Sequence, residues 1–322
     1  MNSGGDNVMT FYRFVPLDAL EDWREQIEDE AAARGLRGTV LLAAEGINGT
    51  LTGTHENLVR FGEWLTAAQP FAGMQCRYSA ASKENRVFYR LKVRIRPEIV
   101  SLGVPVRPAL RTGVHVDAPA WNRLLEDPDV LVIDTRNSYE IEVGSFPAAV
   151  DPGTRTFREF PGFVDRELDP VRHSRVAMFC TGGIRCEKAS AYLLEQGFSE
   201  VYQLDGGVLK YLETVDPEEN RWQGECFVFD QRVSVSESLA EGSFGQCYAC
   251  RRALSPADMR SADYVEGVSC PHCAHRLSEQ QTARFRERRR QVLLAQQRGT
   301  QHVGLAQSAD SGRLRENEEA SE

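Results

Sequence analysis

The chain has 322 residues, of which 41% are hydrophobic and 26% are charged, and its formal net charge is −9. At roughly 100–200 residues per domain the length predicts two or three domains. The composition excludes a collagenous or wholly disordered chain. The negative charge gives no general argument for nucleic-acid binding, so only a local basic patch could support it. Because the chain lacks a secretory signal pattern and any apolar run near the roughly 20 residues of a membrane span, we expect a cytoplasmic protein that does not contact a membrane.

Residues 1–105 alternate short strand patterns with two amphipathic helix patterns. The spacing of apolar residues and the glycine turns predict these elements: a strand at 11–15, a helix at 17–34 closed by Gly35, a strand at 38–44, a turn at 46–49 leading into a strand at 50–52, a helix at 58–65 and a long strand at 87–96. The order β-α-β-β-α-β is typical of a ferredoxin-like, or acylphosphatase-like, α+β domain.

Pro97, Pro105 and Pro108 mark a linker before a second pattern, at residues 106–226. Residues 130–133 and 176–179 are continuous apolar runs, which are typical of strands buried in a parallel sheet. Each run is followed by a loop and a helix pattern, so we expect an α/β domain with a doubly wound parallel sheet. Reactive groups of such a domain lie beyond the carboxyl ends of its strands.

One of these loops has the sequence Cys180-Thr181-Gly182-Gly183-Ile184-Arg185, between a predicted strand and a predicted helix. The two glycines allow the backbone N–H groups to point inward as an anion-binding nest. The helix N-terminus and Arg185 add positive potential, and all three effects favour the thiolate of Cys180. We therefore predict a catalytic cysteine assisted by Arg185, with residues 181–184 as the active-site loop. The alternative is an inert cysteine at the end of a core strand.

The length of this loop separates two kinds of chemistry. Phosphatases that form a cysteinyl-phosphate have five residues between the cysteine and the arginine, whereas Cys180 and Arg185 are separated by four. A tighter nest is suited to a small group carried on sulfur, such as a persulfide.

A basic stripe lies on the strand predicted at 87–96. Alternate residues of a strand point to opposite faces, so Arg90, Lys92, Arg94 and Arg96 share one face at a spacing of about 6.8 Å. No acidic residue alternates with them, and their mutual repulsion would be relieved by a polyanion. The stripe predicts contact with RNA, although a solvated outer face of a sheet is the alternative.

Two Cys-x-x-Cys pairs, Cys247 with Cys250 and Cys270 with Cys273, are separated by 19 residues. This is the spacing of a four-thiolate zinc ribbon, and metal binding could supply the folding energy of a segment too small for its own core. We predict a structural zinc in residues 227–280, with redox pairs or free thiols as the alternative. For residues 281–322 the composition predicts an arginine-rich helix (Arg284 to Arg290) and a disordered tail from Gln301.

Three weaker patterns have simpler explanations. His115 and Asp117 resemble part of a non-haem iron site, but this spacing arises easily by chance. Cys186 could form a disulfide with Cys180, although a cysteine just inside a helix more often packs in the core. The arginines of the last helix could bind RNA or could be solvated.

The residues around the Cys180 loop resemble the rhodanese-like domain. Asp134-Thr135-Arg136 to Glu140 matches its first motif and Leu204 to Gly207 its glycine pair, although Gly144-Ser145-Phe146 departs from the usual Gly-His-Ile. Outside this domain, Ala44 to Thr50, Glu225 to Asp230 and the cysteine pairs are similar to the rhodanese-like tRNA uridine hydroxylases. This resemblance covers about residues 10–275.

Membership of that family implies dioxygen-dependent conversion of the wobble uridine of certain tRNAs to 5-hydroxyuridine by the loop cysteine. It implies dioxygen as co-substrate, structural zinc and the anticodon region of tRNA as partner; no organic cofactor or protein partner is evident from the sequence. A sulfurtransferase that carries a persulfide on Cys180 remains the alternative, because the loop alone would support it. A catalytically silent RNA-binding scaffold is a third reading, against which the intact loop argues.

Overall fold

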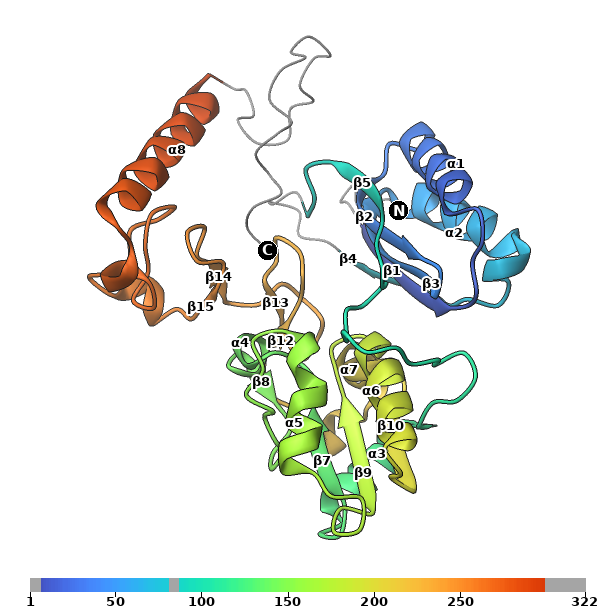
Figure 1. Ribbon diagram of the computed structural model, residues 1–322. Helices are drawn as coiled ribbons and strands as arrows, with labels where there is room; N and C mark the ends of the chain where they lie inside the picture. Colours follow the sequence, from blue (N-terminus) through green and yellow to red (C-terminus); the bar gives the residue numbers. More distant parts are fainter. Residues whose placement is uncertain (1–6, 81–86, 299–322) are drawn as a thin grey trace.

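The structure, a computed structural model, describes residues 7–80 and 87–298 (Figure 1). An N-terminal α+β domain and a C-terminal segment lie on either side of the view, and a central α/β domain lies below both. Among the helices in these two ranges, none combines the length and apolar character needed to cross a membrane.

The N-terminal domain is a five-stranded sheet with the strand order β4-β1-β3-β2-β5. Its elements are β1 (Asn7–Phe14), α1 (Leu20–Ala33), β2 (Arg37–Ala43), β3 (Gly46–Gly53), α2 (His55–Ala67), β4 (Cys76–Ala80) and β5 (Leu91–Ile95). The first four strands and two helices form the expected ferredoxin-like unit. The fifth strand pairs with β2 in parallel at the edge.

The strand expected at 87–96 is wrong in its length and its position. Only Leu91–Ile95 pairs with another strand, and it is an addition at the β2 edge. The last strand of the ferredoxin-like unit is instead Cys76–Ala80, which pairs with β1. Its residues are only half-buried or exposed, so it lacks the apolar alternation that makes a strand visible in a sequence.

The turn expected at 46–49 is also wrong, because these residues begin β3. The chain turns earlier, at Ala44 and Glu45. Gly46 has φ 147°, and a Cβ there would lie 2.0 Å from the carbonyl oxygen of Arg13 on β1. The absence of a side chain at Gly46 therefore allows β3 to lie close to β1, and this glycine does not mark a turn. Helix α1 begins three residues later than expected, after Ala19 in the left-handed conformation.

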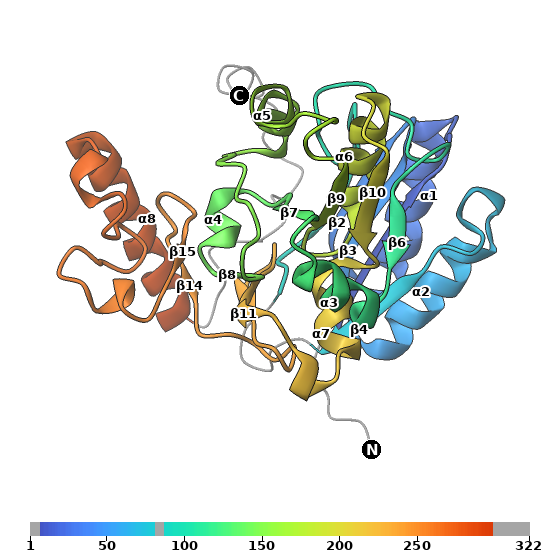
Figure 2. The same cartoon turned by 90° about the horizontal axis from the view of Figure 1, so that it is seen from below.

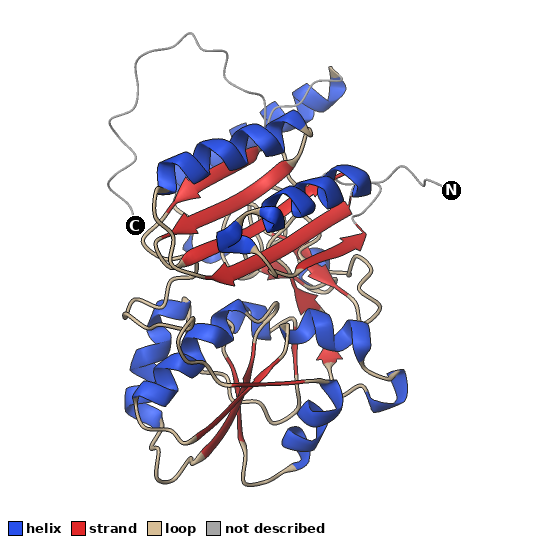
Figure 3. Ribbon diagram, turned by 90° about the vertical axis from the view of Figure 1, so that its right-hand side faces the viewer, coloured by secondary structure: helices blue, strands red, loops and turns tan. Residues whose placement is uncertain are grey.

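The two faces of the N-terminal sheet differ in chemistry. One face packs against α1 and α2 through a core that includes Val40, Leu42 and Phe61. The opposite face carries Thr10, Tyr12, Asn48, Thr50 and Arg77, all of which border the cavity between the domains. Figure 3 shows this sheet above the sheet of the central domain.

The central domain is confirmed as a doubly wound α/β fold. Its sheet has the order β6-β10-β9-β7, and each pair of neighbours is parallel. Helices α5 and α6 pack on one face and α3 and α7 on the other (Figure 2). The elements are β6 (Val114–Val116), α3 (Ala118–Glu126), β7 (Leu131–Asp134), α4 (Ser138–Ile141), β8 (Gly144–Ser145), α5 (Phe160–Glu167), β9 (Arg175–Phe179), α6 (Ile184–Glu195), β10 (Glu200–Leu204) and α7 (Gly207–Thr214).

The C-terminal segment consists of short hairpins and one long helix. Its elements are β11 (Gln223–Gly224), β12 (Cys226–Phe227), β13 (Ser234–Val235), β14 (Gly245–Gln246), β15 (Ala253–Leu254) and α8 (Glu279–Gln297). Strand β11 pairs with β8 of the central domain, which ties the segment to that domain. The predicted arginine-rich helix, from Arg284 to Arg290, is confirmed as part of α8. The tail expected to be disordered, from Gln301, lies outside the described residues.

A buried lysine connects the N-terminal domain, the linker and the central domain. Lys188 on α6 is 1% exposed, and its ammonium lies 2.8 Å from Glu45 and 2.5 Å from Glu98. Glu45 also accepts the N–H of Ile99, and Asn48 donates to the carbonyl of Ile99. Glu45 and Asn48 thus attach the β2–β3 hairpin to the linker, and Lys188 attaches both to α6.

We expect Lys188→Met to loosen the junction between the domains. Removal of the shared cation leaves two partly buried carboxylates facing each other, at a cost of about 3 kcal/mol in the free energy of unfolding. The melting temperature should fall, and proteases should cut the linker around 97–112 faster. As control, Arg221→Ala removes a partly exposed ion pair with Glu126 and should cost under about 1 kcal/mol. Equal melting temperatures for the two variants would contradict the role of Lys188.

Candidate functional site

A cavity of about 910 Å³ lies between the three parts of the chain. The polar face of the N-terminal sheet forms one wall, and residues 228–239 of the C-terminal segment contribute another. The central domain contributes the Cys180 loop, together with Asp205 and Gly206 at the end of β10. The volume is within the range of sites that enclose a small molecule, or one nucleotide of a larger one.

Cys180 follows the last residue of β9, borders this cavity and has no solvent-exposed surface. The N–H of Gly183 donates to its Sγ at 3.1 Å. Burial alone would raise the pKa of Cys180. A hydrogen bond from the Cys186 thiol, the charge of Arg185 and the N–H groups of both residues outweigh burial and lower the pKa to about 6. Cys180 is therefore mainly a thiolate at pH 7.

The side chain of Arg185 forms its hydrogen bonds with Glu140 and none with the sulfur of Cys180. Its guanidinium forms a two-point ion pair with Glu140, at 2.6 and 2.8 Å, and both side chains are buried. Arg185 therefore acts on Cys180 through its backbone N–H and its charge. The guanidinium of Arg185 also lies over the ring of Phe229, a side chain that is 60% exposed.

The N-terminal domain places a tyrosine against the reactive loop. Gly183 has φ 96°, and a Cβ there would lie 2.8 Å from the hydroxyl of Tyr12. Tyr12 donates to Glu187 on α6, which also accepts from Thr112 and pairs with His115. Burial and the charge of Glu187 raise the pKa of Tyr12 well above its ordinary value. Tyr12 therefore remains a neutral hydroxyl at the edge of the loop.

The rest of the loop has mainly structural contacts. The hydroxyl of Thr181 is 3.4 Å from the carbonyl of Phe227, which connects the loop to the C-terminal segment. Ile184 begins α6 and borders the cavity with Gly182. Burial and the neighbouring thiolate raise the pKa of Cys186, so this residue is a thiol that donates to Cys180.

Two residues of the basic stripe lie on a strand, and two lie just outside it. Lys92 and Arg94 lie on β5, next to Thr39 and Leu41 of β2, on the polar face of the N-terminal sheet. Arg90 precedes the strand and Arg96 follows it, so these two residues do not extend the strand row. Burial and the charges of Arg90 and Arg94 lower the pKa of Lys92.

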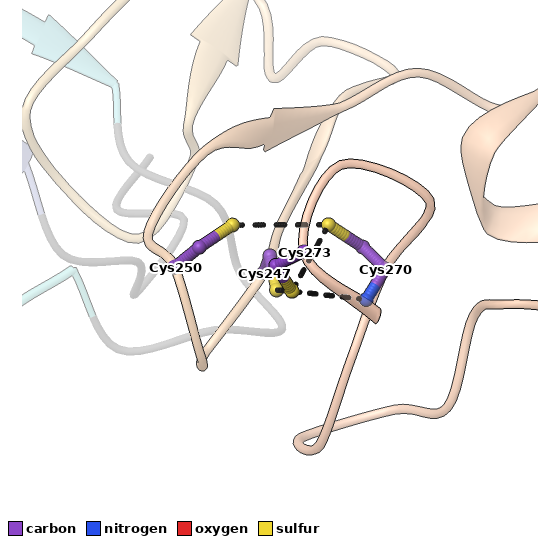
Figure 4. Close-up of side chains that lie close together, drawn as sticks. All are labelled: Cys247, Cys250, Cys270 and Cys273. Atoms are coloured by element: carbon purple, nitrogen blue, oxygen red, sulfur yellow. Dashed lines mark hydrogen bonds between the residues drawn. The ribbon is translucent and has the colours of Figure 1, made fainter. Parts of the chain in front are cut away.

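The four cysteines of the two Cys-x-x-Cys pairs converge in the C-terminal segment (Figure 4). Their sulfur atoms lie within 4.8 Å of one another, and three Sγ–Sγ distances are 3.7, 3.7 and 3.9 Å. A tetrahedral zinc with Zn–S bonds of about 2.3 Å requires sulfur atoms about 3.8 Å apart. The cluster of Cys247, Cys250, Cys270 and Cys273 could therefore hold a metal ion such as zinc.

The weaker patterns have local structural roles. His115 pairs with Glu187, whereas Asp117 caps α3 by accepting the N–H of Ala120. In α8, Arg288 donates to backbone carbonyls of the cysteine segment, and Arg289 pairs with Glu266. Much of the arginine cluster thus attaches the helix to that segment.

Four residues of the site were not predicted from the sequence: Tyr12, Arg77, Glu140 and Glu187. Arg77 on β4 donates to the carbonyl of Gly206 beside the reactive loop. Each of the four acts on a partner far away in the chain, and the sequence contains no local pattern that pairs them. Glu140 alone could have been suspected, because a buried arginine in a loop requires a carboxylate partner.

Two family models match the chain in succession. The UPF0176 acylphosphatase like domain matches residues 7–99, and the Rhodanese-like domain matches residues 118–214. Together they support the acylphosphatase-like and rhodanese-like folds that the sequence predicts.

Similarity to solved structures is weak and partial. A rhodanese-like domain from Anabaena sp. is 22% identical over 34% of this chain and 78% of its own length, with a TM-score of 0.28. An acylphosphatase from Coxiella burnetii is 16% identical over 29% of this chain and 100% of its own length, with a TM-score of 0.23. Reduced Bacillus anthracis CoADR-RHD is 24% identical over 34% of this chain, with a TM-score of 0.28, and this chain spans only 18% of its length.

We expect Cys180 to be alkylated selectively by iodoacetamide. Its labelling rate should rise through pH about 6, the pKa of its thiol. Cys226 is equally buried but has a pKa raised by burial to about 12, and burial raises the pKa of Cys76 to about 11. Both should remain unmodified at pH 7, as peptide mass spectrometry can show. Labelling of Cys180 only above pH 8 would exclude an activated thiolate.

Proposed function

Because the chain belongs to the UPF0176 rhodanese-like family, we propose that it is a tRNA-modifying enzyme that converts the wobble uridine to 5-hydroxyuridine. The observation that carries this proposal is the thiolate of Cys180 on the wall of a cavity of about 910 Å³ that a polar sheet from a second domain helps to enclose. A rhodanese-like loop on its own would not require that second domain. The proposal places the enzyme in the cytoplasm with its tRNA substrate.

The size of the cavity supports a single nucleotide as the part of the RNA that enters it. Enzymes that act on a base take it out of its stack into a closely fitting pocket. The anticodon is a single-stranded loop, so its bases can be turned outward at a low cost. We therefore propose the anticodon region as the part of tRNA that the protein recognises.

In this proposal Cys180 is the reactive nucleophile, acting through a persulfide or a transient bond to the uracil ring. Dioxygen, as co-substrate, supplies the oxygen atom of the product, and its second oxygen atom leaves as water with two electrons and two protons from an external reductant. The N–H groups of Gly183, Arg185 and Cys186 stabilise the negative sulfur. The hydroxyl of Tyr12, from the N-terminal domain, packs against Gly183 of the loop. The ion pair of Arg185 with Glu140 holds the first turn of α6 in place.

A sulfurtransferase is the second candidate function, and the match of residues 118–214 to the Rhodanese-like domain favours it. Cys180 would then carry a persulfide, and the same N–H groups would stabilise its terminal sulfur. The two functions predict different changes in the nucleosides of tRNA.

Mass spectrometry of tRNA nucleosides from a deletion strain should show the loss of 5-hydroxyuridine and its derivatives. The wild-type gene should restore them and Cys180→Ser should not, because a serine hydroxyl is a much poorer nucleophile at neutral pH. Cys76→Ser, outside the cavity-bordering loop, is the matched control and should restore them fully. Loss of 2-thiouridine instead would establish sulfur transfer, and full activity of Cys180→Ser would exclude this cysteine as the nucleophile.

We also propose that the four-cysteine cluster binds a structural zinc. Four thiolates complete a tetrahedron, so no position remains open for a substrate. The core around the cluster is small and consists of Leu254 and the cysteines with a few partly buried neighbours. Metal binding would contribute much of the folding energy of such a segment.

Elemental analysis should therefore find about one zinc ion per chain. Cys247→Ser or Cys273→Ser should lose the metal and lower the solubility of the protein, because the segment unfolds without it. Cys76→Ser should retain the metal, since Cys76 lies on β4 in the other domain. Normal stability of a metal-free wild-type protein would contradict a structural role.

A further inference from the structure

One row of side chains crosses the whole N-terminal sheet on its polar face. The strand register places Lys92 beside Thr39, Thr39 beside Thr50, Thr50 beside Thr10, and Thr10 beside Arg77. Three threonines thus lie in line between two cations. We call these five residues the threonine row.

The row leads from the edge of the sheet into the cavity. Thr50, Thr10 and Arg77 border the cavity, whereas Lys92 lies on the edge strand β5. At its inner end Arg77 donates to the carbonyl of Gly206, and Gly207 packs against the carbonyl of Cys180. The row therefore ends next to the reactive loop.

The chemistry of the row is that of an anion-binding surface. Each threonine is only partly buried, and none of the three hydroxyls has a side-chain hydrogen bond to any part of the chain that the structure describes. Neither Lys92 nor its neighbour Arg94 forms an ion pair within residues 7–80 and 87–298. The strand residues on this face include no aspartate or glutamate.

Acidic residues on the opposite wall of the cavity mostly have polar or cationic partners of their own. Asp230 pairs with Arg232, Asp205 with Lys210, and Glu187 with His115. Glu213 also borders the cavity. Among the described residues that border the cavity, Glu213 is thus the acidic residue whose side chain has no hydrogen-bond or ion-pair partner.

We propose that the single-stranded RNA next to the target uridine crosses the sheet along the threonine row, with its phosphates on Lys92, the threonine hydroxyls and Arg77. This inference rests on the proposed function and deepens it by placing the RNA path. Four spacings between neighbouring strands of about 4.8 Å give a length of about 19 Å, enough for a few nucleotides. RNA-recognition motifs likewise bind single strands on the open face of a sheet.

The charge of the row is tested by the salt dependence of tRNA binding to the full-length protein. Each lost phosphate contact lowers the slope of log affinity against log salt by about 0.7. Lys92→Gln should therefore reduce the slope by about 0.7, and Lys92→Gln with Arg77→Gln by about 1.4. The control is Arg60→Gln, which removes an exposed arginine of α2 on the helix-covered side of the domain and should leave the slope unchanged.

The hydroxyls are tested by replacing Thr10, Thr39 and Thr50 together with valine. Valine keeps the shape and the strand preference of threonine but cannot donate or accept a hydrogen bond. The affinity for tRNA should fall roughly tenfold or more at constant salt, since each hydrogen bond contributes about two- to twelvefold. The salt slope should stay that of the wild type, and the melting temperature should show that the variant is folded.

Three outcomes separate this inference from the proposed function. Smaller slopes for the charge variants and weaker binding by the valine variant support the row. Wild-type binding by all these variants, in a protein that does bind tRNA, overturns the row and leaves the proposed function intact. Absence of any salt-dependent tRNA binding by the wild-type protein overturns both.

Discussion

The first turn of α6 holds the site together, because four consecutive residues contact four different parts of the molecule. Arg185 pairs with Glu140 of the central domain, and Cys186 donates to Cys180. Glu187 binds Tyr12 of the N-terminal sheet. Lys188 pairs with Glu45 and Glu98. A helix turns about 100° per residue, so consecutive side chains point in different directions and one turn can contact all of these partners.

This arrangement requires that ionised groups be removed from water, which costs free energy. Ionised groups such as Arg185, Glu140 and Lys188 are almost fully removed from water, where they are stable only with partners in good geometry. The same low dielectric strengthens each N–H···S⁻ interaction at Cys180. Burial on its own opposes ionisation of the Cys180 thiol. It also strengthens the hydrogen bonds and the charge of Arg185 that stabilise the thiolate.

Local patterns in the sequence predicted most of the fold. The apolar runs at 130–133 and 176–179 identified two strands of the parallel sheet, and the glycines after Cys180 identified the reactive loop. Strand β4 was missed because its residues do not alternate between buried and exposed. Gly46 was misread because a glycine required by close strand contact has the same letter as a glycine required by a turn.

The partners within the site could not be predicted, because they depend on register and on the packing of domains. The sequence predicts that Arg90 to Arg96 form one strand face. In the structure the neighbours of this stripe are set by the pairing of β5 with β2. Lys92 then continues a row of threonines contributed by β2, β3 and β1, strands whose side chains show no basic pattern. A slip of one residue in any of these pairings would turn that strand's contribution to the opposite face.

In the proposed function, activation of the nucleophile and selection of the substrate belong to different domains. The groups that lower the pKa of Cys180 all belong to its own loop and to the first turn of α6. The threonine row belongs entirely to the N-terminal sheet, which meets the loop through Tyr12 and Arg77. If RNA lies along the threonine row as proposed, changes on the sheet should alter RNA binding while the thiolate stays reactive. The junction at Lys188 keeps the two functions in one geometry, since it attaches the hairpin of that sheet to the helix that follows the reactive loop.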